Sequence, residues 1–130
     1  MLLEPVTDSI LRAFYTVYNE LGYGFLEKVY ENALLLELSE SGFDVQNQQT
    51  IRVFYKGPMV GEYCADLIVN DAVILELKAS EALREEHAAQ LKNYLKATDK
   101  EVGLLLNFGK KPEFKRLIFT NTQTWKQSGQ

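Results

Sequence analysis

The chain has 130 residues, the size of one domain, and 46% of them are hydrophobic, which is enough to build a buried core. The single cysteine excludes an internal disulfide and a cysteine-based zinc site, and the net charge of −4 argues against broad, sequence-independent binding to nucleic acid. No segment approaches the roughly 18 to 20 apolar residues of a membrane-spanning helix, and Glu4 and Pro5 stand where a secretory signal would be basic and then apolar, so we expect a cytoplasmic protein without a membrane partner.

Two helices are predicted in the first third of the chain. Apolar residues recur at helical spacing over about Thr7–Leu21, and Thr7 or Asp8 can cap the start of this helix. Gly22 and Gly24 interrupt the pattern, and a second helix follows over about Leu26–Glu40. The second helix has too many apolar residues for one narrow stripe, so we expect it to be largely buried.

The middle of the chain predicts three strands that follow one another as a meander. Apolar and polar residues alternate over Ile51–Tyr55, which indicates a strand, and Gly57 and Pro58 form a turn after it. Two apolar runs then follow, Val60–Val69 and Val73–Lys78, separated by a short polar break that is typical of a hairpin.

The last third predicts a helix over Leu83–Ala97, a buried strand over Val102–Leu106 and a short strand over Leu117–Thr120. The helix would cross from the hairpin to the Val102 strand, so that these two strands run parallel. We therefore expect a single α/β domain over residues 1–120, with two N-terminal helices, a mixed sheet of four to five strands and a crossover helix before the fourth strand. Residues 121–130 are predicted to be a polar C-terminal tail.

Three ionisable residues interrupt the apolar hairpin: Asp66, Glu76 and Lys78. Charged side chains are rarely buried unless they are paired or bind a metal. One interpretation is a site for Mg²⁺, which prefers carboxylate oxygens and whose bound water becomes a nucleophile for phosphate chemistry. The other is a cross-strand ion pair on an exposed sheet face. The residues alone favour neither interpretation.

The turn of the hairpin provides a test of a shared site. A strict two-residue turn at Asn70 and Asp71 would place Glu76 on the side opposite Asp66. A three-residue loop, with Val69 facing Val73, would place Asp66 opposite Glu76. We therefore predict a three-residue loop or a bulge.

The order of these residues resembles the PD-(D/E)XK nuclease superfamily, whose motif is an Asp, a gap and Glu-x-Lys on a hairpin followed by a helix. The segment GFLEKVY, residues 24–30, also fits the Gly-x-x-Glu-x-x-Tyr signature of the GxxExxY family, a bacterial and archaeal group within that superfamily. Residues 87–95 and 105–109 are similar to the same family, and the resemblance extends over about residues 10–119. Ala65 stands where the superfamily's name has a proline. The resemblance implies a restriction-endonuclease-like fold.

The resemblance also assigns roles to four residues. Asp66 and Glu76 would be ligands of Mg²⁺ or Mn²⁺, and Lys78 would be the catalytic lysine. Glu27 matches the helical acidic residue that completes the metal site. Taken without the resemblance, Glu27 is an acidic residue in the first turn of a helix, where acidic residues are favoured anyway.

The predicted third helix carries further candidates. Gln90 and Tyr94 match a Gln-x-x-x-Tyr pair that borders the active site in exonuclease-like branches, although core-edge packing explains them equally well. His87, one turn before Gln90, could touch a phosphate, but a lone histidine near a helix start is more often structural. Tyr30 is expected to pack and to form hydrogen bonds rather than to react.

Basic residues concentrate late in the chain, and Lys92 and Lys96 are four residues apart on the predicted third helix. They could contact phosphates along a nucleic-acid path. An ordinary solvated helix face is the better interpretation for a chain of net charge −4.

The leading hypothesis is a nuclease dependent on Mg²⁺ or Mn²⁺ that hydrolyses phosphodiester bonds in DNA, with RNA as an alternative substrate. The second hypothesis is a non-catalytic module that keeps the nuclease fold and binds nucleic acid or a protein partner. A third, weaker hypothesis is a metal-dependent phosphoesterase for small nucleotides. A homodimer is compatible with so small a domain, because two sites could address two strands.

Overall fold

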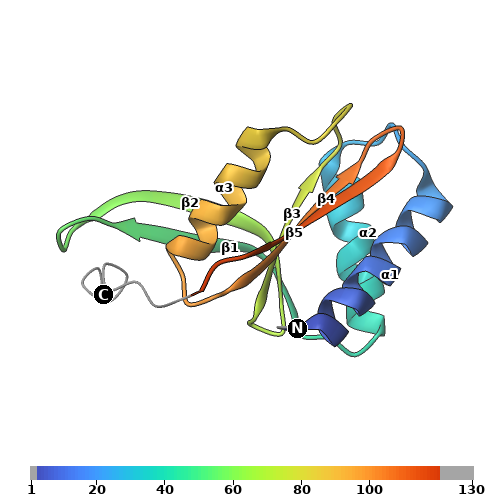
Figure 1. Cartoon of the computed structure of the whole chain (residues 1–130). Helices are drawn as coiled ribbons and strands as arrows, with labels where there is room; N and C mark the ends of the chain where they lie inside the picture. The colour runs from blue at the N-terminus through green and yellow to red at the C-terminus, as the bar shows by residue number, and fades with distance from the viewer. Residues whose placement is uncertain (1–2, 121–130) are drawn as a thin grey trace.

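The computed structural model describes residues 3–120, which form three helices and a five-stranded sheet (Figure 1). The elements in chain order are α1 (Glu4–Leu21), α2 (Glu27–Glu40), β1 (Val45–Phe54), β2 (Met59–Val69), β3 (Val73–Lys78), α3 (Glu85–Lys96), β4 (Val102–Phe108) and β5 (Pro112–Ile118). None of the helices within these residues is long and apolar enough to cross a lipid bilayer.

The sheet is mixed, and its strands lie in the order β1-β2-β3-β4-β5. Every neighbouring pair is antiparallel except β3 and β4, which are parallel and are connected through α3. This confirms the predicted restriction-endonuclease-like α/β fold with a crossover helix before the fourth strand.

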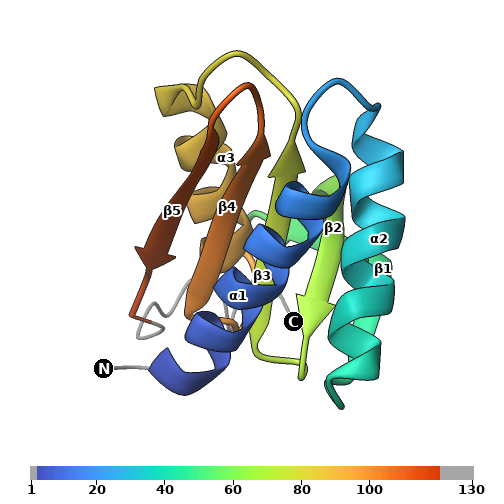
Figure 2. The ribbon, with the colours of Figure 1, turned by 90° about the vertical axis from the view of Figure 1, so that its right-hand side faces the viewer.

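Helices cover both faces of the sheet, with α1 and α2 on one face and α3 on the other (Figures 1 and 2). Alternate strand residues therefore enter two separate cores. Leu75 and Leu104 pack with α1 and α2, whereas Ile74 and Leu105 pack under α3. All seven residues of β4 are buried, as expected for a strand covered on both faces.

The hairpin between β2 and β3 has the predicted three-residue loop. Val69 pairs with Val73, and Asn70, Asp71 and Ala72 lie between them. Asn70 and Asp71 adopt the left-handed conformation, with φ of 54° and 52°, which these two residue types tolerate better than most. The register that a shared carboxylate site requires is therefore confirmed.

The hairpin of β1 and β2 extends beyond the rest of the sheet (Figure 1). β2 pairs with β1 from Met59 to Val69 but with β3 only from Leu67 to Val69. The first part of β2 thus pairs with β1 alone, and the two strands form a projecting ribbon that we call the arm, residues 49–65. Tyr55 and Tyr63 on the arm are exposed.

The predicted start of the first helix was wrong. α1 begins at Glu4, with Pro5 in its first turn, so that Thr7 is not a cap. Thr7 is instead buried, and its hydroxyl donates a hydrogen bond to the Glu4 carbonyl at 3.1 Å.

The strands at the edges of the sheet also differ from prediction. β1 begins at Val45 rather than Ile51, and the last strand covers Pro112–Ile118 rather than Leu117–Thr120. Both are outer strands of the sheet, where exposed polar side chains hide the alternation that defines a strand in the sequence. The predicted tail, residues 121–130, lies outside the described residues.

A buried asparagine joins the end of β4 to the loop that follows β3. The Asn107 side chain accepts a hydrogen bond from the Ser80 N–H at 3.0 Å and donates one to the Ser80 carbonyl at 2.9 Å. Gly109 lies against the same carbonyl, and a Cβ atom added there would collide with it. The close approach of these two segments therefore requires glycine at position 109.

Gly109→Ala is expected to lower the free energy of unfolding by about 1–3 kcal/mol, because the added methyl group must displace the Ser80 backbone. Urea denaturation of the purified variant measures this. Gly61→Ala is the matched control, since its Cβ would meet only the Tyr63 ring at 3.9 Å. Equal stability of the two variants would contradict the proposed contact.

Candidate active site

β2 and β3 separate at Asp66 and Glu76, one position beyond the last paired residues, Leu67 and Leu75. Beyond this point, the two carboxylates accept backbone hydrogen bonds between the strands. The Leu77 N–H donates to Asp66 Oδ2 at 2.8 Å, and the Asp66 N–H donates to Glu76 Oε1 at 3.2 Å. Each carboxylate thus accepts a hydrogen bond from the backbone of the opposite strand.

Burial gives both carboxyl groups an unusual affinity for protons. It raises the pKa of Glu76 to about 8, and the charge of Asp66 adds to this effect. Burial also raises the pKa of Asp66, against the opposing hydrogen bond from Leu77. The pair is therefore poised to hold a proton or a cation near neutral pH.

Lys78 is the last residue of β3 and lies opposite Asn107 of β4. Its positive charge lowers the pKa of both Asp66 and Glu76. Lys78 is therefore close enough to act on both carboxyl groups. Its effect on their pKa values is smaller than that of burial, so both pKa values remain raised. The structure thus places the three predicted residues of the hairpin in one neighbourhood.

α2, which covers the same face of the sheet as α1, adds two acidic residues to this neighbourhood. Glu27, in its first turn, accepts a hydrogen bond from the Ala79 N–H at 3.3 Å, directly after β3. The charges of Glu31 and Glu27 both raise the pKa of Asp66. Glu27 therefore lies beside the end of β3.

Glu31 was not predicted as a site residue. It is only 5% exposed, and it accepts hydrogen bonds from Lys28 at 3.1 Å and from Gln48 of β1 at 2.9 Å. Its position four residues after Glu27 was the available signal, because residues at that spacing share a helix face.

On the other face of the sheet, Tyr94 of α3 is buried close to the carboxylates. Burial, followed by the charges of Glu76 and Asp66, raises the pKa of its phenol to about 12. Its ring lies 5.5 Å from that of Tyr63. Gln90, one turn earlier, is exposed, and within residues 3–120 it makes no hydrogen bond to either carboxylate.

His87 and Tyr30 have structural contacts. His87 Nδ1 accepts a hydrogen bond from the Arg84 N–H at 3.2 Å, which caps the start of α3. The Tyr30 ring is fully buried and stacks on Phe108 with the centroids 4.2 Å apart. The hydroxyl of Tyr30 donates to the Gly22 carbonyl at 2.6 Å.

The fold and the hairpin motif agree with the comparison against protein families. The family model of the PD-(D/E)XK nuclease superfamily matches residues 4–117. The chain belongs to this superfamily. None of the curated proteins matches it.

Among solved structures, this PD-(D/E)XK domain is similar to a crystal structure of a protein called SSO0001, with a TM-score of 0.57 and 16% sequence identity. The similarity covers 78% of this chain and 54% of that one, so the chain spans about half the length of the solved structure that it matches. At this identity the match supports the fold alone.

PD-(D/E)XK nucleases generally use divalent metals, and the acidic residues of this chain suit such an ion. Hard cations prefer carboxylate oxygens, and Glu27, Glu31, Asp66 and Glu76 supply them close to the hairpin. Within residues 3–120, however, no group of three or more Asp, Glu, His or Cys side chains is arranged as a finished metal site. Asp66, Glu76 and Glu27 each bind a backbone N–H instead.

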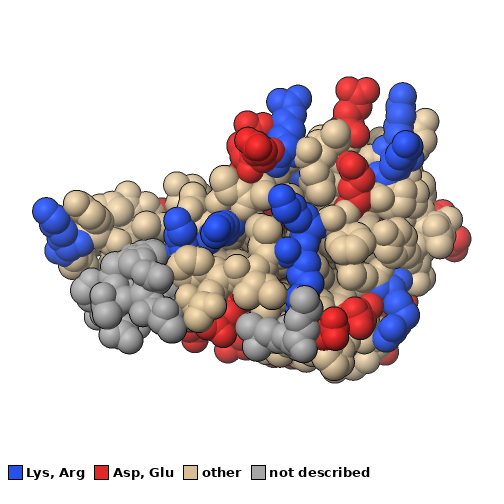
Figure 3. Space-filling model, viewed as in Figure 1, with Lys and Arg blue, Asp and Glu red and all other residues tan. Residues whose placement is uncertain are grey.

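The surface that carries α3 and β5 has a mixed charge (Figure 3). Lys92 of α3 is exposed and Lys96 is half-buried. Lys100, just beyond this helix, pairs with Asp71 at 2.9 Å and with Asp99 at 2.7 Å. The positive charge of Lys100 is therefore offset by the chain's own acidic residues.

The raised pKa of Glu76 should make the domain less stable as the pH rises. An unfolded glutamate releases its proton near its ordinary pKa of 4.5, whereas folded Glu76 retains it up to about pH 8. Between these values the unfolded state binds fewer protons, so a higher pH favours unfolding. Urea denaturation from pH 5 to 8 should show this decline, and Glu76→Gln should flatten it. The control, Glu40→Gln, changes an exposed residue at the end of α2 and should keep the wild-type slope.

Proposed function

We propose that this protein is a divalent-metal-dependent nuclease that hydrolyses phosphodiester bonds in DNA. The observation that carries the proposal is the Asp66–Glu76 pair, held across the separation of β2 and β3 with Lys78 beside it. In a member of the PD-(D/E)XK superfamily, two carboxylates and a lysine at this point form the motif that names the group.

Each residue of the proposed site would have its own role in the hydrolysis. Asp66, Glu76 and Glu27 would hold Mg²⁺ or Mn²⁺, and Glu31 would add negative charge next to Asp66. When bound, the ion lowers the pKa of a water molecule and offsets charge that develops on the phosphate. Lys78 would orient the attacking water and stabilise negative charge on the phosphate oxygens. Tyr94 retains its proton at neutral pH and can donate a hydrogen bond beside the pair.

Finer assignments remain predictions. Gly24, Glu27 and Tyr30 support membership of the GxxExxY branch and, with it, a bacterial or archaeal source. The choice of DNA over RNA, a cytoplasmic location, a homodimer and the extent of the domain over residues 1–120 also stay predictions.

A second candidate function is a non-catalytic module that binds nucleic acid or a protein partner. One observation favours it: Asp66 and Glu76 already bind backbone N–H groups, so they stabilise the sheet without any metal. Divalent-ion binding without turnover of any nucleic acid would support this candidate over the nuclease.

Lys78→Ala is expected to lower cleavage of DNA in Mg²⁺ or Mn²⁺ at least a hundredfold while the thermal stability changes little, because Lys78 is only half-buried at the end of β3. A gel assay on labelled single- and double-stranded DNA and RNA measures the rate. Lys56→Ala, at the tip of the arm, is the control and should keep wild-type cleavage. Absence of cleavage by the wild-type protein on every substrate would refute the nuclease.

Binding of Mn²⁺ should depend on pH, because Glu76 must release a proton to coordinate the ion. The association constant measured by calorimetry should fall up to about tenfold for each pH unit below 8. Repeating the titration in buffers of different ionisation enthalpy should reveal the released proton. Asp66→Asn should abolish binding, whereas Glu40→Gln should leave it unchanged. An affinity that is constant from pH 6 to 8 would contradict a role for Glu76 as ligand.

A further inference from the structure

A pocket of about 340 Å³ opens next to the candidate active site. Its walls come from three segments distant in sequence: residues 23–26 between α1 and α2, residues 79–81 after β3, and residues 108–110 between β4 and β5. These connections meet at the upper end of the domain in Figure 2. The volume lies near the lower limit of ligand pockets, roughly 300 to 1,000 Å³, which fits one small molecule or one nucleotide.

Hydrogen bonds hold all three walls of the pocket in place. The Tyr30 hydroxyl donates to the Gly22 carbonyl and accepts from the Phe25 N–H, which fixes the first wall. The Asn107 side chain fixes Ser80 in the second wall. In the third wall, the Tyr18 hydroxyl lies 2.7 Å from both the Gly109 and the Lys110 carbonyl oxygens. The pocket is therefore formed before a ligand arrives.

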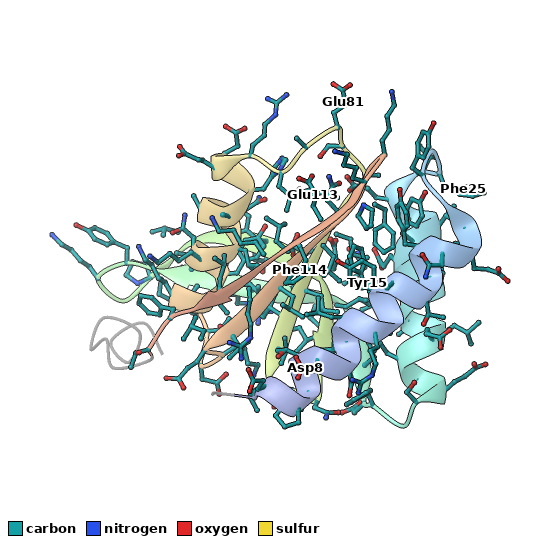
Figure 4. The ribbon with its side chains drawn as sticks, turned by 45° about the vertical axis from the view of Figure 1, so that its right-hand side comes forward. Asp8, Tyr15, Phe25, Glu81, Glu113 and Phe114 are labelled. Atoms are coloured by element: carbon teal, nitrogen blue, oxygen red, sulfur yellow. The ribbon has the colours of Figure 1, made fainter. Side chains whose placement is uncertain are left out.

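The pocket presents aromatic side chains that the core does not use. Tyr23 is 57% exposed and Phe25 is 47% exposed, although both belong to a loop that is tied to the core. Phe25 packs edge-on against Tyr30 with the ring centroids 6.1 Å apart. Phe25 and Glu81 lie at the same end of the molecule (Figure 4). Exposed aromatic rings on a rigid loop are suited to stack on a flat ligand.

The pocket and the acidic site share a wall. Ala79 lines the pocket, and its N–H donates to Glu27, one of the proposed metal ligands. Lys78 directly precedes Ala79 in the chain. A phosphodiester held at Lys78 would therefore have an adjacent base within reach of the pocket.

We propose that this pocket takes one unpaired nucleotide of the nucleic-acid substrate, with its base against Tyr23 and Phe25. The positive charge of Lys110 in the pocket wall would attract the negatively charged phosphate. The Glu81 carboxylate can accept a hydrogen bond from an exocyclic amino group of the base. The proposal rests on the proposed nuclease function and makes it more specific. It predicts a preference for single-stranded substrate, because a base inside a duplex is stacked and cannot enter a pocket.

The test compares binding of a fluorescent eight-nucleotide single-stranded DNA with that of its duplex, by anisotropy. All proteins keep Lys78, and divalent metal is left out of the buffer so that no turnover interferes. Tyr23→Ala and Phe25→Ala are each expected to weaken single-strand binding roughly 5- to 100-fold and duplex binding less than twofold. Tyr55→Ala is the matched control, because Tyr55 is a tyrosine of comparable exposure, at 63%, on the distant arm. It should change neither affinity.

Three results would contradict the proposed nucleotide pocket. The first is wild-type affinity in both pocket variants, the second is an equal loss of affinity for duplex and single strand, and the third is an equal loss of affinity in Tyr55→Ala. Wild-type affinity would also be the outcome if the pocket held an apolar side chain of a protein partner. If Phe25→Ala fails to fold, Tyr23→Ala still decides, since Tyr23 is the more exposed of the two.

Failure of the nuclease proposal can be distinguished from failure of the pocket proposal. A wild-type protein that binds single strands through the pocket but cleaves nothing would count against the nuclease. Cleavage by the wild-type protein together with unchanged binding by the pocket variants would count against the pocket.

Discussion

The fold depends on the exchange of hydrogen bonds at the point where β2 leaves β3. A strand that turns away from its neighbour leaves buried N–H groups without partners, which is costly. Here the Asp66 carboxylate accepts the hydrogen bond of the Leu77 N–H, and the Glu76 carboxylate accepts that of the Asp66 N–H. The separation frees the first part of β2 to form the arm and opens space between two central strands. The same two residues therefore stabilise the sheet and create the acidic site.

This dual role has an electrostatic cost. The buried Glu76 lies next to the half-buried Asp66, and further acidic residues on α2 act on the same region. Burial and mutual repulsion favour the protonated forms, so the site gains most from a ligand that brings positive charge. Lys78 reduces the imbalance but does not remove it. A divalent cation is the ligand that best offsets such an arrangement, which links the proposed metal dependence to the geometry of the hairpin.

The sequence was most informative at the β2–β3 hairpin, where the number of loop residues determines which side chains face each other. The spacing of the hairpin turn required a three-residue loop if Asp66 and Glu76 were to meet, and Val69 does pair with Val73. It was least informative at the sheet edge and on α2. β5 is an outer strand in which Glu113, Lys115 and Arg116 obscure any alternation, so only its pairing with β4 defines it. Glu31 was not predicted as a site residue, because its hydrogen bond from Gln48 joins α2 to a strand that is distant in the sequence.

The Gly-x-x-Glu-x-x-Tyr segment acquires a physical explanation from the structure. Gly24 has φ of 110°, which side chains disfavour, Glu27 bonds to Ala79, and Tyr30 anchors the loop that carries Phe25. The segment thus connects the acidic site to the aromatic pocket.

The proposed pocket also reconciles the net charge of −4 with the proposed nucleic-acid substrate. Duplex binding depends mainly on Lys and Arg contacts to phosphates, and part of the basic surface is neutralised through Lys100. Stacking of an unpaired base on an aromatic ring does not need excess positive charge. A small acidic domain with this pocket is therefore better suited to single strands than to the backbone of a duplex.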